Sequence, residues 1–210
     1  MEKGKYISIS FVGVLSIPLS KIPALSREFG KELFDNDAGT DTFFGPDGLV
    51  IMIPNKIVPM VVINPLKITI KTATADKMNQ ILSSLIAKLK EEGVDTALSA
   101  FGINYEIQYL NLEKESETWL WNRFIKDEIK TTLPENFCNK LNFRINVNEQ
   151  QSLNISIEPR MGVHDGLFVG VNHHHNVSFK ELPPINELET YAKNSCNVVN
   201  SVLKELIGEK

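Results

Sequence analysis

The chain has 210 residues, of which 42% are hydrophobic and 23% charged, and it carries a formal net charge of −4. This length allows one large domain or two small ones with a substantial core, and the composition is that of a folded protein rather than a disordered one. The 22 Lys and Arg residues are outnumbered by 26 Asp and Glu. The sequence therefore lacks the basic footprint of a nucleic-acid-binding protein.

Two apolar stretches resemble a targeting segment and a membrane-spanning segment, but the residue pattern of each argues against that role. Residues 1–20 have early lysines before an apolar run, but Ile7, Ile9 and Phe11 alternate with serines, which is the period of a half-buried strand. The apolar window 49–66 is interrupted by three prolines and a lysine, so it cannot cross a bilayer as a helix. We expect a cytoplasmic, soluble protein. Cys138 and Cys196, which form no C-x-x-C pair, suit a reducing compartment.

The first half of the chain predicts short strands and two helices. Residues 6–14 alternate as a strand, residues from Pro23 to 34 read as a helix, and the Asp-, Asn- and Gly-rich residues 35–48 read as a loop. Residues 49–54 and 58–63 are continuous apolar runs, which are typical of strands covered on both faces. Residues 66–71 extend the second run after a bend.

The strongest helix signal covers residues 75–93. Its apolar residues recur at intervals of three and four, and Gly93 is a natural stop. Residues 102–110 then alternate strictly, with Tyr105 among the residues on the apolar face.

A charged linker at 111–117 precedes a helix with two tryptophans, Trp119 and Trp121. We place a boundary here, between an N-terminal α+β half at 1–112 and a C-terminal α+β half at 113–210, which could also form one continuous domain. Two residues apart on a helix, the tryptophans cannot share one face. One is expected in the core and the other at an interface with a protein partner.

The second half predicts strands at 141–148, 153–157 and 167–171, followed by an amphipathic helix at 185–207. Residues 61–71 and 169–180 share a short pattern and each precedes a long helix, which hints at an internal duplication. The predicted fold class is α+β, with mostly antiparallel sheet and helices packed on one face. Two ferredoxin-like halves are the preferred version.

All four histidines fall between residues 164 and 175. Residues 164–166 read as a three-residue hairpin loop, a register that places Ile157 opposite His173. His164 is then about 20 Å from the other histidines at about 3.3 Å per residue, too far to share a metal ion with them. His173 and His175 share the apolar face, and His174 points the other way.

Three interpretations of His173 and His175 stay open. They are structural groups at the edge of the core, half of a metal or small-ligand site whose third ligand the sequence does not identify, or a pH-sensitive contact. The sequence contains no phosphate-binding loop, nucleophile elbow or H-E-x-x-H motif. It therefore predicts no catalytic residue and no cofactor, with a divalent metal at His173 and His175 as the alternative.

The leading functional hypothesis is a non-catalytic protein that acts through self-association or as a subunit of a larger assembly. The rival is a metal-assisted hydrolase or small-molecule-binding protein that uses His173 and His175. A third hypothesis is a ligand cavity between the helices and the sheet, without chemistry. We expect no nucleic-acid partner and no membrane.

Overall fold

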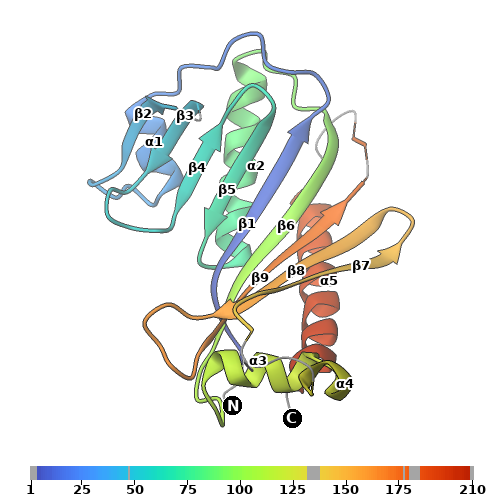
Figure 1. Cartoon of the computed structure of the whole chain (residues 1–210). Coiled ribbons are helices and arrows are strands. Elements are labelled where there is room, and N and C mark those ends of the chain that lie inside the picture. Colours follow the sequence, from blue (N-terminus) through green and yellow to red (C-terminus); the bar gives the residue numbers. More distant parts are fainter. Residues whose placement is uncertain (1–3, 47, 132–137, 177, 180–184, 209–210) are drawn as a thin grey trace.

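A computed structural model of the chain describes residues 4–46, 48–131, 138–176, 178–179 and 185–208. Nine strands form one antiparallel sheet in the order β2-β3-β4-β5-β1-β6-β9-β8-β7 (Figure 1). The strands are β1 Lys5–Leu15, β2 Asp41–Gly45, β3 Gly48–Met52, β4 Met60–Ile63, β5 Lys67–Thr72, β6 Leu98–Tyr109, β7 Leu141–Asn148, β8 Gln151–Pro159 and β9 Leu167–His175. The helices are α1 Arg27–Leu33, α2 Ala75–Glu91, α3 Ser116–Phe124, α4 Asp127–Lys130 and α5 Ile185–Leu203, which continues as a π-helical turn, η1, at Lys204–Gly208.

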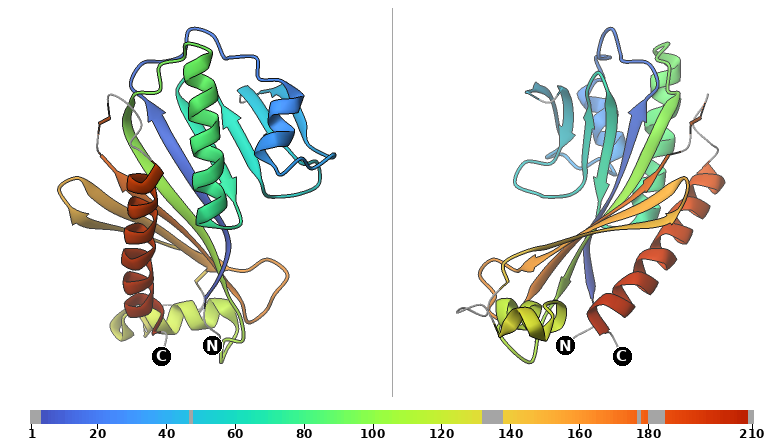
Figure 2. Two further views of the ribbon diagram at one scale, coloured as in Figure 1. Left: turned by 180° about the vertical axis from the view of Figure 1, so that it is seen from behind. Right: turned by 45° about the vertical axis from the view of Figure 1, so that its right-hand side comes forward.

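The long helices lie on one face of the sheet and leave the other face open. Seen from behind, α2 and α5 run side by side across the sheet, and α1 covers β2 and β3 on the same face (Figure 2). Alternate residues of each strand point to this helix-covered face and form the core, including Phe11, Ile70, Ile103 and Val171. The intervening residues point to the open face, which no described helix covers (Figure 1).

The architecture confirms the predicted α+β class with antiparallel pairing. The duplication is not confirmed, because residues 60–72 form the β4–β5 hairpin, whereas residues 169–179 comprise most of β9 and an isolated bridge at Phe179. The sheet is continuous across the proposed boundary at residue 112, since β6 pairs along its length with β9. The two sequence halves therefore share one sheet.

Two local predictions for the N-terminal half were wrong. The first helix begins at Arg27 rather than near Pro23, because the Ser26 side chain accepts a hydrogen bond from the Phe29 backbone N–H and caps the helix there. The segment predicted as a loop contains strand β2, which pairs with β3 from Asp41 to Gly45. Its cross-strand neighbours, rather than its own turn-rich composition, decide its conformation.

The predicted three-residue hairpin loop between β8 and β9 was also wrong. The pairing ends at Pro159 opposite Leu167, and residues 160–166 form the connection. Gly162 has a φ of +76°, and the Val163 N–H donates to the Arg160 carbonyl, so this segment makes its own turn and leaves the ladder. His173 therefore lies opposite Leu153 instead of Ile157.

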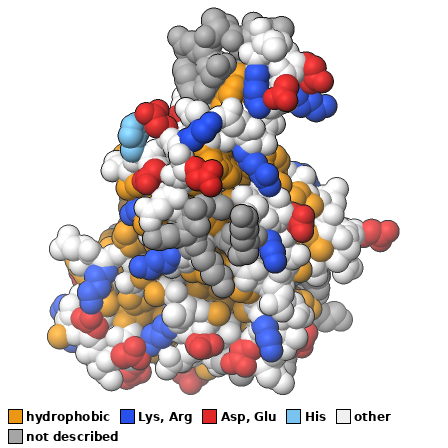
Figure 3. Space-filling view, turned by 90° about the horizontal axis from the view of Figure 1, so that it is seen from below, with side chains coloured by type: hydrophobic (Ala, Val, Ile, Leu, Met, Phe, Trp, Pro, Cys, Tyr) orange, Lys and Arg blue, Asp and Glu red, His pale blue; other side chains and the backbone are white. Residues whose placement is uncertain are grey.

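Lys and Arg side chains are interspersed with Asp and Glu over the surface seen from below (Figure 3). In the described part of the chain, no helix combines the length and the apolar character that crossing a bilayer requires.

Candidate functional site

The two inward-facing histidines lie in the core beneath α5. β9 places His173 and His175 on the helix-covered face, where their exposed fractions are 1% and 2%, and His174 on the open face. The changed register moves His173 by an even number of residues relative to β8, so the predicted face is unaffected. The predicted burial of His173 and His175 on the apolar face is confirmed.

A short chain of hydrogen bonds connects His173 to β6 through α5. The Tyr105 hydroxyl donates to the Ser195 hydroxyl oxygen at 2.8 Å, and Ser195 Oγ lies 2.8 Å from Nδ1 of the His173 ring. Ser195 is fully buried. Among the described residues, His173 Nε2 and both ring nitrogens of His175 have no hydrogen-bond partner.

Aromatic side chains hold the His175 ring instead of polar ones. His175 stacks on Phe101 with ring centroids 4.4 Å apart and an interplanar angle of 5°. Tyr191 contacts it edge-on, and the His173 ring lies 4.3 Å away. Burial of the imidazoles disfavours their charged forms and lowers the pKa of each to about 4, and the neighbouring histidines add to the lowering at His175. Both rings are therefore neutral near pH 7.

A metal centre at the histidine pair would need a third protein ligand. The described residues contain no group of three or more His, Cys, Asp or Glu side chains that could hold a metal ion. His164 lies in the β8–β9 connection with an 80% exposed side chain, 3.0 Å from Glu115. Two imidazoles alone form half of a tetrahedral zinc site.

A second feature is a cavity of about 510 Å³ on the helix-covered face, between the start of α2 and the middle of α5. Tyr105 and Ile9 on the sheet, together with Ala192 on α5, contribute buried apolar surface to it. Tyr105 thus links this cavity to the hydrogen-bonded chain that ends at His173.

The open face of the sheet has a polar half over β1, β6, β9, β8 and β7. Along one cross-strand row, Ser10, Asn104, Asn172, Asn154 and Arg144 are consecutive neighbours. Asn104 donates to Ser10 at 3.2 Å, and Asn172 donates to Asn104. Ser10 and the asparagines of this row thus hydrogen-bond to one another, and such polar side chains suit a surface in contact with water.

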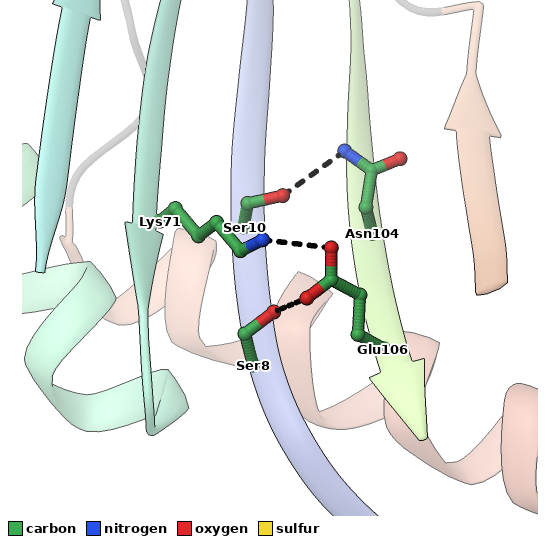
Figure 4. Close-up of polar contacts among 5 residues, drawn as sticks. All are labelled: Ser8, Ser10, Lys71, Asn104 and Glu106. Atoms are coloured by element: carbon green, nitrogen blue, oxygen red, sulfur yellow. Dashed lines mark hydrogen bonds and ion pairs between the residues drawn. The ribbon is translucent and has the colours of Figure 1, made fainter. Parts of the chain in front are cut away.

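An ion pair lies at the centre of the open face (Figure 4). Lys71 Nζ contacts Glu106 Oε1 at 2.7 Å, and the Ser8 hydroxyl donates to Glu106 Oε2 at 2.6 Å. Partial burial by itself would raise the pKa of Glu106, but the hydrogen bonds from Lys71 and Ser8 hold it below its ordinary value.

Over β2, β3 and β4 the open face is largely apolar. We call this surface the apolar patch; it comprises Phe43 on β2, Val50 and Met52 on β3, and Met60 and Val62 on β4. Cross-strand pairing makes most of these residues direct neighbours in two rows. Phe43 is 41% exposed and the rest are half-buried.

The sequence predicted strands covered on both faces at β3 and β4, and here the structure differs. Ile51, Val61 and Ile63 are fully buried under the helices. No described element covers Val50 or Val62 on the opposite side. The described part of the chain therefore leaves this second apolar face to solvent.

The predicted interface tryptophans lie on α3 at one end of the sheet (Figure 1). Trp121 is 7% exposed and belongs to the buried residues, whereas Trp119 is half-buried and its ring meets Phe124 edge-on. Phe124 in turn contacts Phe143 on β7. Trp121 thus packs within this chain, and an interface role for Trp119 stays a prediction.

Sequence reasoning missed Ser195 and the role of Tyr105. Ser195 stands between Ala192 and Val199 at helical spacing, so a polar residue interrupts the apolar stripe of α5. That interruption is the signal that could have identified it, because a buried hydroxyl requires a partner.

No family model matches the chain, and no curated protein is significantly similar to it.

Proposed function

We propose that this protein is non-catalytic and acts through self-association, as a homodimer in which the apolar patches of two copies stack face to face. The observation that carries the proposal is that β3 and β4 are apolar on both sides while helices cover only one side. An antiparallel strand with one solvated face normally alternates apolar and polar residues. A contiguous exposed apolar patch is typical of an association surface.

The pattern of residues around the patch favours a second copy of the same chain as the occupant. One cross-strand row reads Asp41, Met52, Met60 and Lys71 from β2 to β5, with an acid at one end and a base at the other. A twofold axis parallel to the strands, between β3 and β4, sets Asp41 of one copy over Lys71 of the other. It also sets Met52 over Met60. The apolar centre of the row is therefore self-complementary, whereas the charge of Lys71 is already met by Glu106 within the chain.

Stacked sheets pack about 10 Å apart through interdigitating side chains, which suits valines and methionines. Methionine adapts its shape to irregular gaps. The hydrogen-bonded polar half of the open face lies beside the patch and would remain wet at the rim of such an interface. Free cysteines at positions 138 and 196 accord with the cytoplasm as the place of this association.

Light scattering over a dilution series tests the proposal. Val62→Glu places a carboxylate at the centre of the patch and should convert the dimer to a monomer, because a buried unpaired charge is costly. Phe43→Ser, at the exposed edge strand, should weaken association with less risk to folding. The matched control is Ser156→Glu on the polar half of the same face, which should leave the dimer intact.

The three variants must first give the same far-ultraviolet circular dichroism as the unmodified protein. A monomer at all concentrations for the unmodified chain contradicts the proposal. So does a dimer that survives Val62→Glu and Phe43→Ser but dissociates with Ser156→Glu.

A further inference from the structure

Three alanines contribute to the walls of the cavity between α2 and α5, the two long helices on this face of the sheet (Figure 2). Ala73 and Ala75 lie at the start of α2, and Ala192 lies on the facing side of α5. Their short side chains leave about 510 Å³ unfilled, a size typical of small-molecule sites. The cavity opens to solvent beside the exposed residues Glu189 and Lys193, so a ligand can enter it from the surface.

The inner surface of the cavity is suited to an apolar or aromatic group. Ile9 and Tyr105 line it from the sheet, and the Tyr6 ring meets the Tyr105 ring edge-on at 5.8 Å. A flat apolar side chain placed here would pack against two aromatic rings.

One buried polar atom of the cavity has no partner within the described chain. Asn79 is 3% exposed and lines the cavity, and its side-chain oxygen has no hydrogen-bond partner among the described residues. A buried amide oxygen in this state favours a ligand with an N–H donor.

Charges of both signs line the outer part of the same cavity. Asp76 on α2 and Glu189 on α5 supply carboxylates, and Lys193 supplies an ammonium group. Glu189 and Lys193 are four residues apart on α5, a spacing at which ion pairs form, yet within the described residues none of the three is in an ion pair. The start of α2 adds the positive end of a helix dipole.

We infer that this cavity binds a small zwitterion with an apolar body, such as a free amino acid with a large apolar side chain. Asp76, Glu189 and the Asn79 oxygen accept from its ammonium group. Lys193 holds its carboxylate. Its side chain packs on Ile9 and Tyr105.

Three probes of equal body and different charge test the ligand class by isothermal titration calorimetry. They are L-phenylalanine, phenethylamine, which lacks the carboxylate, and 3-phenylpropionate, which lacks the amine. L-Phenylalanine should bind at least about tenfold more tightly than either analogue, since each loses one charged contact. Equal or tighter binding of one analogue overturns the zwitterion assignment, and no binding of any probe overturns the site.

A cavity-filling pair of variants localises the binding. Ala75→Leu fills the mouth of the cavity and should raise the dissociation constant by about tenfold or more. Ala87→Leu makes the same change at an exposed position of the same helix and should leave it unchanged. Equal effects of the two variants would place the ligand elsewhere.

The site is independent of the proposed dimer, because the cavity and the apolar patch lie on opposite faces of the sheet. Phe43→Ser should therefore keep L-phenylalanine binding while it weakens association. Failure of one proposal leaves the other standing.

Discussion

Acidification should destabilise the fold through His173 and His175. Each imidazole has an ordinary pKa of 6.5 that burial lowers to about 4 in the folded protein. The unfolded chain therefore binds protons at these groups at a pH where the folded protein does not. Their contribution to stability is intact above about pH 6.5 and is lost progressively as the pH falls toward about 4.

The size of the effect follows from the same pKa values. A difference of about 2.5 in pKa, at about 1.4 kcal/mol per pKa unit, corresponds to on the order of 3 kcal/mol for each histidine. Domains are typically stable by about 5–15 kcal/mol, so the loss from two histidines is a large fraction of the total.

Urea unfolding at a series of pH values measures this loss. His175→Phe keeps a flat ring stacked on Phe101 and removes the ionisable group, so the variant should lose less stability between pH 6.5 and 4 than the unmodified protein. At neutral pH it should be at least as stable, because two buried nitrogens without partners are removed. His164→Asn, at an exposed position, is the control and should keep the steep pH dependence. If the free energy of unfolding fell equally with decreasing pH in the unmodified protein and in His175→Phe, the reasoning would be refuted.

Two further predictions concern folding stability. Gly48 has a φ of +122° and a Cβ there would meet the Ile63 carbonyl, so Gly48→Ala should cost at least about 2 kcal/mol by urea unfolding. Gly93→Ala, where φ is also positive but the space is open, should cost only about 1 kcal/mol, and equal costs would contradict the role of the close contact. Ser195→Ala removes the hydrogen-bond partner of His173 Nδ1 and should cost about 1–3 kcal/mol, whereas the same change at an exposed serine of α5 should cost little. If Ser195→Ala left the free energy of unfolding unchanged, the chain of hydrogen bonds would contribute nothing to stability.

The strands, and the face to which each of their side chains points, were predictable wherever apolar and polar residues alternate strictly. The strand at 141–148 has the predicted bounds, and the helix predicted at 75–93 was found at Ala75–Glu91. The register of β8 against β9 was not predictable, because a shift by an even number of residues keeps every side chain on its face. The prediction that His173 and His175 face the core was therefore correct, although the predicted length of the hairpin loop was wrong.

Long-range features of the candidate sites were beyond the sequence. The contact between Ser195 and His173 joins α5 to β9, and the cavity is lined by residues of the sheet, α2 and α5 that are far apart in the sequence. The apolar runs at β3 and β4 were predicted to be strands covered on both faces, whereas the described helices cover only one face. The sequence could not show this, because coverage depends on where the helices pack.

Sedimentation equilibrium of the unmodified protein tests the central claim most directly. If two copies bury the exposed valines and methionines of β3 and β4 against each other, the weight-average mass rises with concentration from 23.6 kDa and levels off at twice that value. A mass that stays at 23.6 kDa up to the highest attainable concentration would contradict the account.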